Sequence, residues 1–416
     1  MKVLDCSAVG MYHLELEALT RNFSPRFAFW NTATPTLNSD LDLAYRIKSV
    51  VPDVITGVMG THVTADPNAA LANISIDMVI RREPEETIRE VCHSEDINLR
   101  KVAGLSYRDP KSQMICRNKD RDFIPPQNIP TPAWHFLDLA PYRLPLKGRP
   151  FLIVAPVRGC PWECSFCTAP LYYGRKLRKR PVSAVMDEIS RGMVRFGIRD
   201  FFVWADTFTA DPGYVMAFSN ELLNRNLKIR WTCNSRVDTL TWKMLTKMKR
   251  AGLWMISFGL ESGNNNILEK SGKKITVDQS RRAVAMAHEI GIRTSGHFIL
   301  GLPGETEQTL QETLNLSLEL PLDIAQFYAA APFPGTELYK DAKKFGWLCE
   351  DNSFSQNAAV MNLPGLSQKR VNEFRRYAHR RFYGRPKALW KILRMIEVES
   401  LKDILKGVGA FVGNRV

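Results

Sequence analysis

The chain has 416 residues, of which 45% are hydrophobic and 24% are charged, and its formal net charge is +14. This length allows two or three domains with substantial cores, which excludes a disordered chain or a small disulfide-stapled protein. No apolar run reaches the roughly 18 to 20 residues of a membrane span, and three clustered cysteines with five scattered ones fit a reducing compartment. We therefore expect a cytoplasmic protein.

The positive charge is concentrated at the end of the chain. From Leu366 to Val416 there are thirteen lysines or arginines and four acidic residues, which is +9 of the +14. The rest of the chain is only moderately basic, which argues against nucleic acid as a partner.

Residues 1–100 alternate short apolar runs with helical segments, which predicts a small doubly wound (Rossmann-like) α/β domain. Strands are expected at 2–4, 27–30, 54–58 and 76–80, and helices near 11–22, 39–50, 67–73 and 84–93. Residues 101–149 are expected to form a hairpin (102–107 and 114–117) and a proline-rich linker, because prolines at that density neither continue a helix nor donate to a β-ladder.

From residue 151 the alternation has a longer period, with six apolar runs that are each followed by a helical segment. The strands are expected at 151–156, 200–204, 228–232, 254–259, 293–300 and 323–329. Right-handed crossovers between parallel strands would curl residues 150–345 into a partial (β/α)6 barrel of the TIM type. Residues 346–416 are expected to form a basic helical carboxyl-terminal region.

Three cysteines follow the first strand of this barrel, at Cys160, Cys164 and Cys167. A loop that leaves a buried strand can wrap three thiolates around one metal centre. Three protein ligands leave one coordination position free, as in a working metal site rather than a closed structural one.

Polar or glycine-rich segments follow the other strands too. Because chemistry collects at the carboxyl ends of barrel strands, we expect these segments to converge on a ligand. Loops after strands are also polar for reasons of turn chemistry, so each residue taken singly is as readily structural as functional. The candidates are Asp206, Thr207, Arg236, Glu261, Ser262, Gly301 and Glu305.

The cysteine spacing, with Phe166 just before the last cysteine, resembles the signature of radical S-adenosylmethionine (SAM) enzymes, and the resemblance covers residues 150–345. It implies that the three thiolates hold a four-iron four-sulfur cluster, whose fourth iron binds the amine and carboxylate of SAM. One electron from the cluster, supplied by an external donor, would cleave the sulfonium and release a 5′-deoxyadenosyl radical. A zinc site would need a fourth ligand nearby, and the closest histidine, His135, lies in the linker.

The same resemblance implies roles for the strand-end residues. Asp206 with Thr207, and Glu261 with Ser262, would contact the amino group and ribose of SAM, and Arg236 would face its carboxylate. The segment from Gly301 to Glu305 is similar to the family segment near adenine. No residue is assigned a catalytic role on the substrate.

Residues 1–100 resemble the cobalamin-binding domain found ahead of many such barrels, on segments 32–36, 60–64 and 81–87. The resemblance implies a bound cobalamin. No Asp-x-His-x-x-Gly motif is present to supply a cobalt ligand, and the strand and helix that usually begin this domain are missing, since Met1 falls near its second strand. The alternative is a domain that serves only as a partner surface.

Three further residues are of types that often act in catalysis, and we interpret them as structural. His62 and His297 are interpreted as satisfied loop and core histidines, and Cys233 as a small buried residue rather than a hydrogen-atom donor. Between residues 371 and 405, aromatic and aliphatic residues interleave with cations, which suits packing against the barrel and also an anionic membrane surface. We favour packing, with peripheral contact at the inner membrane surface as the alternative.

The resulting hypothesis is a cobalamin-associated radical SAM enzyme that methylates or rearranges an unactivated carbon of a small-molecule or lipid-like substrate. The chain is similar to radical enzymes that act on hopanoid and other hydrophobic substrates. One alternative is a radical tRNA-modifying enzyme of the methylthiotransferase kind, which would carry three further cysteines in its front domain and a β-rich end. The other is a non-catalytic iron–sulfur scaffold or sensor, against which the polar strand ends argue.

Overall fold

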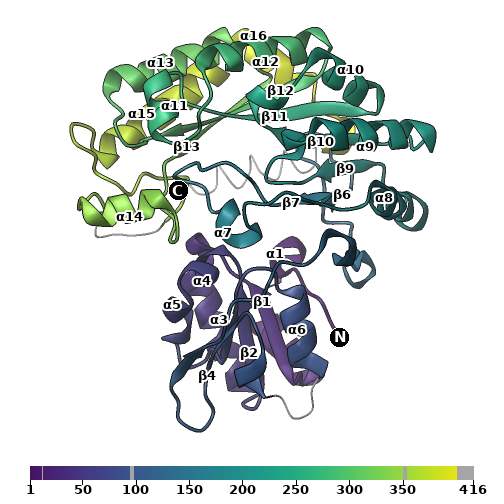
Figure 1. The fold of residues 1–416 in the computed structure, drawn as a ribbon, viewed down its shortest axis with the longest axis vertical. Helices are drawn as coiled ribbons and strands as arrows, with labels where there is room; N and C mark the ends of the chain where they lie inside the picture. Colours follow the sequence, from purple (N-terminus) through teal and green to yellow (C-terminus); the bar gives the residue numbers. More distant parts are fainter. Residues whose placement is uncertain (12, 94–97, 350–353, 401–416) are drawn as a thin grey trace.

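The described residues form two large β-sheets, a smaller front sheet and a larger main sheet, which Figure 1 shows one below the other. A third sheet has only two strands, which lie just before and just after the cysteine-containing loop. The computed structural model describes residues 1–11, 13–93, 98–349 and 354–400. Within these ranges, the helices are all too short or too polar to cross a lipid bilayer.

The front domain extends from the amino terminus to Arg117. Its helices and strands, in chain order, are α1 (Cys6–Val9), α2 (His13–Phe23), β1 (Phe27–Asn31), α3 (Leu37–Val50), β2 (Ile55–Met59), α4 (Thr61–Ala65), α5 (Pro67–Leu71), β3 (Met78–Ile80), α6 (Glu85–His93), β4 (Leu105–Arg108) and β5 (Ile115–Arg117).

The front sheet follows the order of the chain, with β1, β2 and β3 parallel and β4 and β5 added antiparallel. Its side chains alternate between two covered faces. Val58 and Val79 pack with α3, α4 and α5, whereas Met78 and Ile80 pack with α6. Helices on both faces agree with the doubly wound prediction. The predicted hairpin, β4 with β5, belongs to this sheet, which therefore continues past residue 100.

Residues 2–4 do not form the strand predicted for them. Asp5 follows as the N-cap of α1, where its carboxylate accepts a hydrogen bond from Ala8 N at 3.0 Å. The same carboxylate accepts a hydrogen bond at 2.8 Å from the hydroxyl of Tyr142 in the linker. The segment is therefore held by the linker, and three residues are too short a run to form a strand without a paired neighbour.

The main sheet and the tail occupy the rest of the described chain. Their helices and strands are β6 (Phe151–Val154), β7 (Val157–Arg158), α7 (Ala169–Tyr173), β8 (Arg178–Lys179), α8 (Val182–Phe196), β9 (Asp200–Val203), α9 (Pro212–Asn224), β10 (Arg230–Ser235), α10 (Trp242–Arg250), β11 (Leu253–Glu261), α11 (Asn265–Lys270), α12 (Val277–Glu289), β12 (Arg293–Leu300), α13 (Glu307–Glu319), β13 (Ile324–Ala329), α14 (Glu337–Lys344), α15 (Gln368–Tyr383) and α16 (Pro386–Leu393).

Six parallel strands form the main sheet in the order β13-β12-β11-β10-β9-β6, and they coincide with the six strands predicted. The sheet is open, with β6 and β13 at its edges. Helices cover its outer face, and Figure 1 shows the front domain on the opposite side. The alternation of side chains follows this arrangement: Phe258, Phe298 and Phe327 are buried in the main core, whereas their neighbours Ser257 and His297 line an inner cavity.

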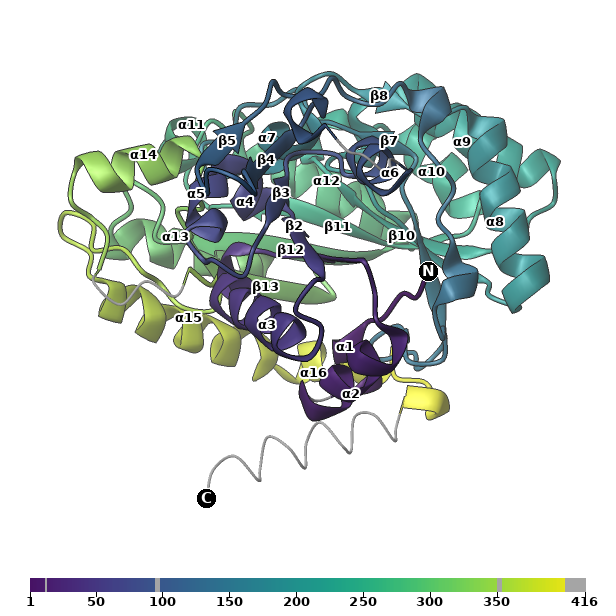
Figure 2. The same cartoon turned by 90° about the horizontal axis from the view of Figure 1, so that it is seen from below.

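Helix α15 packs along the edge strand β13, and Figure 2 shows the two side by side. The Tyr383 hydroxyl donates to Ala325 O at 2.7 Å and accepts from Ala325 N at 3.3 Å, so it satisfies edge groups that no strand pairs. Phe374 and Phe382, on the inward face of the helix, join the main core. This part of the tail therefore packs on the sheet. Residues 401–416, which the prediction included in the helical tail, lie outside the described residues.

Candidate active site

The three cysteines lie in the loop between β7 and α7, beyond the carboxyl end of β6. Gly159 opens the loop with a φ of 92°, and a Cβ there would lie 2.3 Å from a backbone carbonyl oxygen, so only glycine fits. Hydrogen bonds from Cys160 N to Gly174 O at 3.1 Å and from Ser165 N to Ser271 O at 2.8 Å anchor the loop at both ends. The backbone thus holds the cysteines in a defined arrangement.

A cavity of about 220 Å³ opens beside this loop. It brings together all three cysteines and side chains from the ends of β9, β10, β11 and β12, as the sequence predicts for the carboxyl ends of parallel strands. The lining residues are Cys160, Trp162, Cys164, Phe166, Cys167, Asp206, Thr207, Asn234, Ser235, Arg236, Ser257, Gly259, Glu261, Lys273 and His297.

The donor set consists of three thiols, which are soft ligands of the kind that hold iron–sulfur clusters. Within the described ranges, no three histidine, cysteine or acidic side chains gather as the ligands of one ion do. The thiols instead stand around the cavity. Burial raises the pKa of Cys167 to about 12 and the pKa of Cys164 above its ordinary value. These thiols therefore become thiolates when they bind iron and release their protons.

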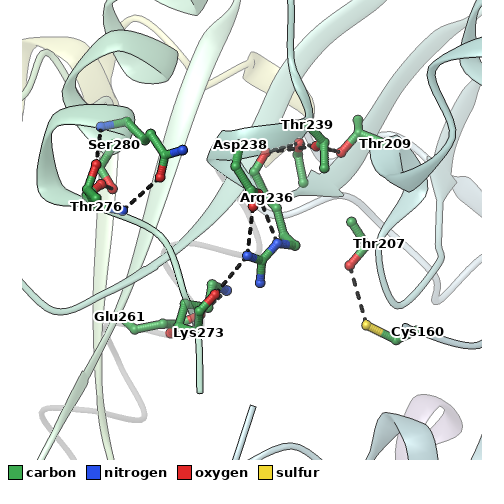
Figure 3. Close-up of polar contacts among 12 residues, drawn as sticks. Cys160, Thr207, Thr209, Arg236, Asp238, Thr239, Glu261, Lys273, Thr276 and Ser280 are labelled. Carbon is green, nitrogen blue, oxygen red and sulfur yellow. Dashed lines mark hydrogen bonds and ion pairs between the residues drawn. The ribbon is translucent and has the colours of Figure 1, made fainter. Parts of the chain in front are cut away.

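Asp206 and Thr207 follow β9 and stand beside Cys160. The Asp206 carboxylate accepts a hydrogen bond from Gly159 N at 3.1 Å, and the Thr207 hydroxyl lies 3.8 Å from the Cys160 sulfur (Figure 3). Burial raises the pKa of Asp206 to about 6, although the hydrogen bond and two nearby arginines oppose this shift. The Asp206 carboxylate thus ties the end of β9 to the first turn of the cysteine loop.

Arg236, at the end of β10, is held by three groups. Its Nε and Nη2 donate to the two Asp238 carboxylate oxygens at 2.9 Å, and Nη2 also donates to the Lys273 carbonyl at 2.8 Å (Figure 3). The guanidinium carbon lies 4.4 Å from the centre of the Trp162 ring, in the cysteine loop. This bidentate and stacked cation is therefore fixed at the wall of the cavity.

Glu261 and Lys273 form a buried ion pair next to Arg236, with Nζ 2.7 Å from Oε1 and each side chain 8% exposed (Figure 3). Burial alone would lower the pKa of Lys273, but the Glu261 carboxylate raises it above its ordinary value. Glu261 has a φ of 60° at a register shift between β11 and β12, a strained conformation that costs about 1–3 kcal/mol. Sequence reasoning missed Lys273, because it lies in the loop after α11 rather than at a strand end.

Ser262, Gly301 and Glu305 are not among the residues that line the described cavity. The Ser262 hydroxyl accepts a hydrogen bond from Asn264 N at 3.2 Å, and the Glu305 carboxylate accepts hydrogen bonds from Gly301 N and Leu302 N. Burial raises the pKa of Glu305 to about 8, against these two backbone donors. The side chains of Ser262 and Glu305 order their own loops, and their contact with SAM stays a prediction.

His297 lines the cavity from β12, which the interpretation as a core histidine did not anticipate. Its Nδ1 lies 3.2 Å from the hydroxyl of Tyr328, and that hydroxyl donates to Gln326. The phenol oxygen has one proton to give, so it accepts from His297, whose Nδ1 carries the proton. Burial lowers the pKa of His297, which keeps the ring neutral with Nε2 as an acceptor. Cys233, by contrast, is fully buried in the main core.

The loop after β3 of the front domain reaches the cysteine loop. The buried Glu83 carboxylate accepts hydrogen bonds from Arg178 at 2.8 and 2.9 Å and from Arg158 at 2.8 Å. Arg158, two residues before Cys160, also donates to Glu85 at 2.6 Å. Four charged side chains therefore join the front domain to the start of the cysteine loop.

The loops after β1 and β2 lie at the same edge of the front sheet. A Cβ at Gly60 would lie 2.0 Å from the Thr32 carbonyl oxygen, so the two loops touch. His62 Nδ1 lies 3.0 Å from the Thr34 hydroxyl, as expected for a satisfied loop histidine, and burial lowers its pKa. The buried Thr32 hydroxyl has no hydrogen-bond partner among the described residues. The buried hydroxyls of Tyr107, Ser219 and Thr294 also have no partner among the described residues, so this one does not by itself mark a ligand site.

A cysteine loop on an open parallel α/β sheet, with buried charges at the strand ends, defines the class: an enzyme built around a metal cluster. The model of the Radical SAM superfamily matches residues 154–317. An uncharacterized methyltransferase of Pyrococcus horikoshii is 31% identical, over 94% of this chain and 86% of the relative. The chain belongs to the radical SAM superfamily, whose cofactors are a four-iron four-sulfur cluster and SAM.

Two more distant matches also cover most of this chain. Cytidylyl-2-hydroxyethylphosphonate methyltransferase of Streptomyces wedmorensis is 26% identical, over 76% of this chain and 67% of the relative. The radical SAM methyltransferase TsrM from Kitasatospora setae, solved with cobalamin and a four-iron four-sulfur cluster bound, superposes with a TM-score of 0.71 at 15% identity. That superposition covers 96% of this chain and 85% of TsrM, so the two proteins share a fold.

Proposed function

We propose that the protein is a cobalamin-dependent radical SAM methyltransferase in which Cys160, Cys164 and Cys167 hold the cluster. The observation that carries this proposal is the single cavity on which the three thiols and the charged strand ends converge. The methyltransferase names of the two sequence relatives, and the cobalamin bound by TsrM, support the choice of reaction.

The cavity wall offers groups of both signs to SAM, which is a zwitterion at its methionyl end. Arg236 and Lys273 provide positive charge for the carboxylate, and Asp206 and Glu261 provide acceptors for the amine and the ribose hydroxyls. When bound, the cluster supplies an electron to the sulfonium of SAM, and cobalamin carries a methyl group. The chain itself fixes these cavity groups before any ligand arrives, since each is already hydrogen-bonded or ion-paired.

The carboxyl edge of the front sheet would hold the cobalamin. Thr32, Gly60 and His62 lie there, and the unpaired Thr32 hydroxyl is one group that such a ligand would satisfy. The ion pairs of Glu83 with Arg158 and Arg178 would keep this edge beside the cysteine loop.

The inner face of the main sheet favours a substrate with one apolar and one polar part. On β6 and β9 the paired side chains Ile153 and Phe202 are at least partly exposed, whereas Ser257 and His297 make the inner face of β11 and β12 polar. A small or lipid-like molecule with a polar end suits such a surface.

The test is anaerobic reconstitution of the full chain with iron, sulfide and hydroxocobalamin. We expect about four irons and one cobalamin per chain. After a low-potential chemical reductant has reduced the bound cobalamin by two electrons, we expect methyl transfer from labelled SAM to it. Cys164→Ala should abolish the cluster absorbance, whereas Cys233→Ala, which removes a buried thiol outside the cavity, should leave it intact. An intact cluster in the Cys164 variant would refute the ligand assignment. A reconstituted cluster without bound cobalamin would refute the cobalamin assignment alone.

A further inference from the structure

Helix α16 presents an apolar face to the surface of the protein. Leu389, Trp390 and Leu393 are 51%, 58% and 59% exposed, and their spacing places them on one side of the helix. Ala388 is the buried residue of the helix, and Met395 just beyond it is buried too. A surface helix normally turns its apolar stripe inward. Here the larger apolar side chains point away from the core.

Polar contacts fix α16 in this orientation. On its inner side, Lys391 Nζ donates to the carbonyl oxygens of Pro321 and Leu322 at 2.8 and 2.9 Å. Just before the helix, Arg385 Nη1 donates to Leu318 O at 2.8 Å. These cations bind the carbonyl groups that end α13 and begin the next loop, so α16 is not free to rotate its leucines inward.

The surface around this face is positively charged. Arg394 stacks on Trp390, with the guanidinium carbon 5.1 Å from the ring centre. The nearby acidic residue Glu397 is already paired with Lys147 and Arg149. Five cations of α15 and α16 are exposed and have no ion pair within the part of the chain that the structure describes: Arg376, Arg380, Arg381, Lys387 and Arg394.

We propose that α16 and the end of α15 bind the surface of an anionic lipid bilayer, with Leu389, Trp390 and Leu393 inserted among the headgroups. Apolar and indole side chains flanked by unpaired cations are the combination that binds such a surface, by burial of apolar area and by attraction to anionic lipids. Figure 1 shows α16 on the outer side of the main sheet, opposite the front domain. Membrane contact there leaves the cysteine loop and the front domain clear of the lipid.

The test is cosedimentation of the full-length protein with vesicles of phosphatidylcholine alone or mixed with phosphatidylglycerol. We expect binding to the mixed vesicles that is at least about tenfold tighter than to phosphatidylcholine, and that weakens in about 0.5 M salt, where the Debye length shrinks to a few ångströms. Trp390→Ala should weaken binding about tenfold, which corresponds to the loss of one partly buried large side chain. Trp242→Ala is the matched control, because Trp242 is 50% exposed on α10 and should not affect binding.

Three results would overturn the proposal. They are no binding to the mixed vesicles, equal binding by the Trp390 and Trp242 variants, and self-association of the chain in solution that Trp390→Ala abolishes while vesicle binding remains. Trp390 is exposed, so both variants are expected to fold, and a circular dichroism spectrum checks this. An Arg380→Gln, Arg381→Gln double variant supplies a second measurement. It should weaken binding to the mixed vesicles and leave the weak binding to phosphatidylcholine unchanged.

Discussion

Replacing Glu83 by glutamine would remove the negative charge that joins the front domain to the cysteine loop. Its carboxylate bridges Arg158 and Arg178, and it also accepts a hydrogen bond from Ile124 N at 2.9 Å. The side chains of Glu83, Arg178 and Arg158 are 3%, 7% and 12% exposed, so water can do little to replace the lost charge. Glutamine keeps the volume and one acceptor oxygen, but its NH2 group faces two donors in either orientation. Two of the four hydrogen bonds that the carboxylate accepts are therefore lost together with the charge.

Breaking a buried ion pair by removing one partner costs about 3–5 kcal/mol, because the other charge stays buried without compensation. Arg158 keeps its ion pair with Glu85, and the glutamine keeps one oxygen that accepts hydrogen bonds. We therefore expect the free energy of unfolding to fall by the lower end of this range, roughly 3 kcal/mol. With an unfolding entropy of about 2.1 cal/mol/K per residue, that loss lowers Tm by roughly 12 °C if the front domain, which ends at Arg117, unfolds by itself. It lowers Tm by roughly 3 °C if the 416-residue chain unfolds as one unit. Thermal unfolding followed by circular dichroism measures it.

A second measurement distinguishes an effect of Glu83 on the position of the cysteine loop from its effect on the stability of the fold. Arg158 stands two residues before Cys160, so we expect Glu83→Gln to shift the electron paramagnetic resonance spectrum of the reduced cluster. Glu188→Gln is the matched control, because Glu188 forms a buried pair with Arg180 at 2.6 Å that does not involve the front domain. It should lower Tm comparably without altering the spectrum. A change of less than 1 °C in Tm for Glu83→Gln, or the same spectrum for both variants, would refute the reasoning.

Three further predictions concern residues away from this contact. Burial raises the pKa of Glu305 from 4.5 to about 8 in the folded chain. As the pH rises above 4.5, the unfolded chain loses this proton while the folded chain keeps it. The free energy of unfolding therefore falls between pH 4.5 and 8, by up to roughly 3 kcal/mol at pH 7. Glu305→Gln should flatten this dependence in urea titrations, and an unchanged slope would contradict the assignment. Phe382→Ala should cost about 3–5 kcal/mol in the same titrations. Arg376→Ala, at an exposed position of the same helix, should cost about 0.5 kcal/mol or less, and equal losses would show that α15 does not contribute to the core. Tyr328→Phe removes the acceptor of His297 Nδ1–H, so nitrogen-15 NMR of labelled histidine should show the proton moving to Nε2, and an unaltered spectrum would exclude the inferred tautomer.

The main sheet could be predicted from the sequence because its strands have a strong physical signature. Each strand buries one face under helices, as Phe298 and Phe327 do, and turns the other toward the cavity. The cysteine loop was visible for a different reason: the spacing of three cysteines in eight residues has few structural explanations. Strand ends then place Asp206 and Glu261 near the cysteines, since parallel strands end at one edge.

Other cavity residues could not be predicted, because they arrive from segments without a periodic pattern. Lys273 comes from a loop between two helices, and Trp162 is in the cysteine loop but acts by stacking on Arg236. The prediction of a strand at residues 2–4 was wrong because a local pattern was given too much weight. Val3 and Leu4 are apolar enough for a strand, although Lys2 is charged, and Asp5 caps a helix directly after them. An apolar run of two or three residues forms a β-strand only where a neighbouring strand can pair with it, and the sequence pattern does not show whether one is present.

The contact between the front domain and the cysteine loop is the hardest feature to predict, because Glu83 and Arg158 are 75 residues apart in the chain. Nothing in either segment distinguishes these charges from solvated ones. Only the fold shows that Glu83, Arg158 and Arg178 share one desolvated site, where each charge is tolerated because the others are present. A domain joined by apolar area alone could slide by a side chain's width at little cost, whereas bidentate hydrogen bonds fix both distance and angle. The charges at this contact therefore favour one orientation of the front-domain edge toward the cysteine loop. The unpaired cations of α15 and α16 face solvent on the far side of the sheet and place no such constraint on the fold.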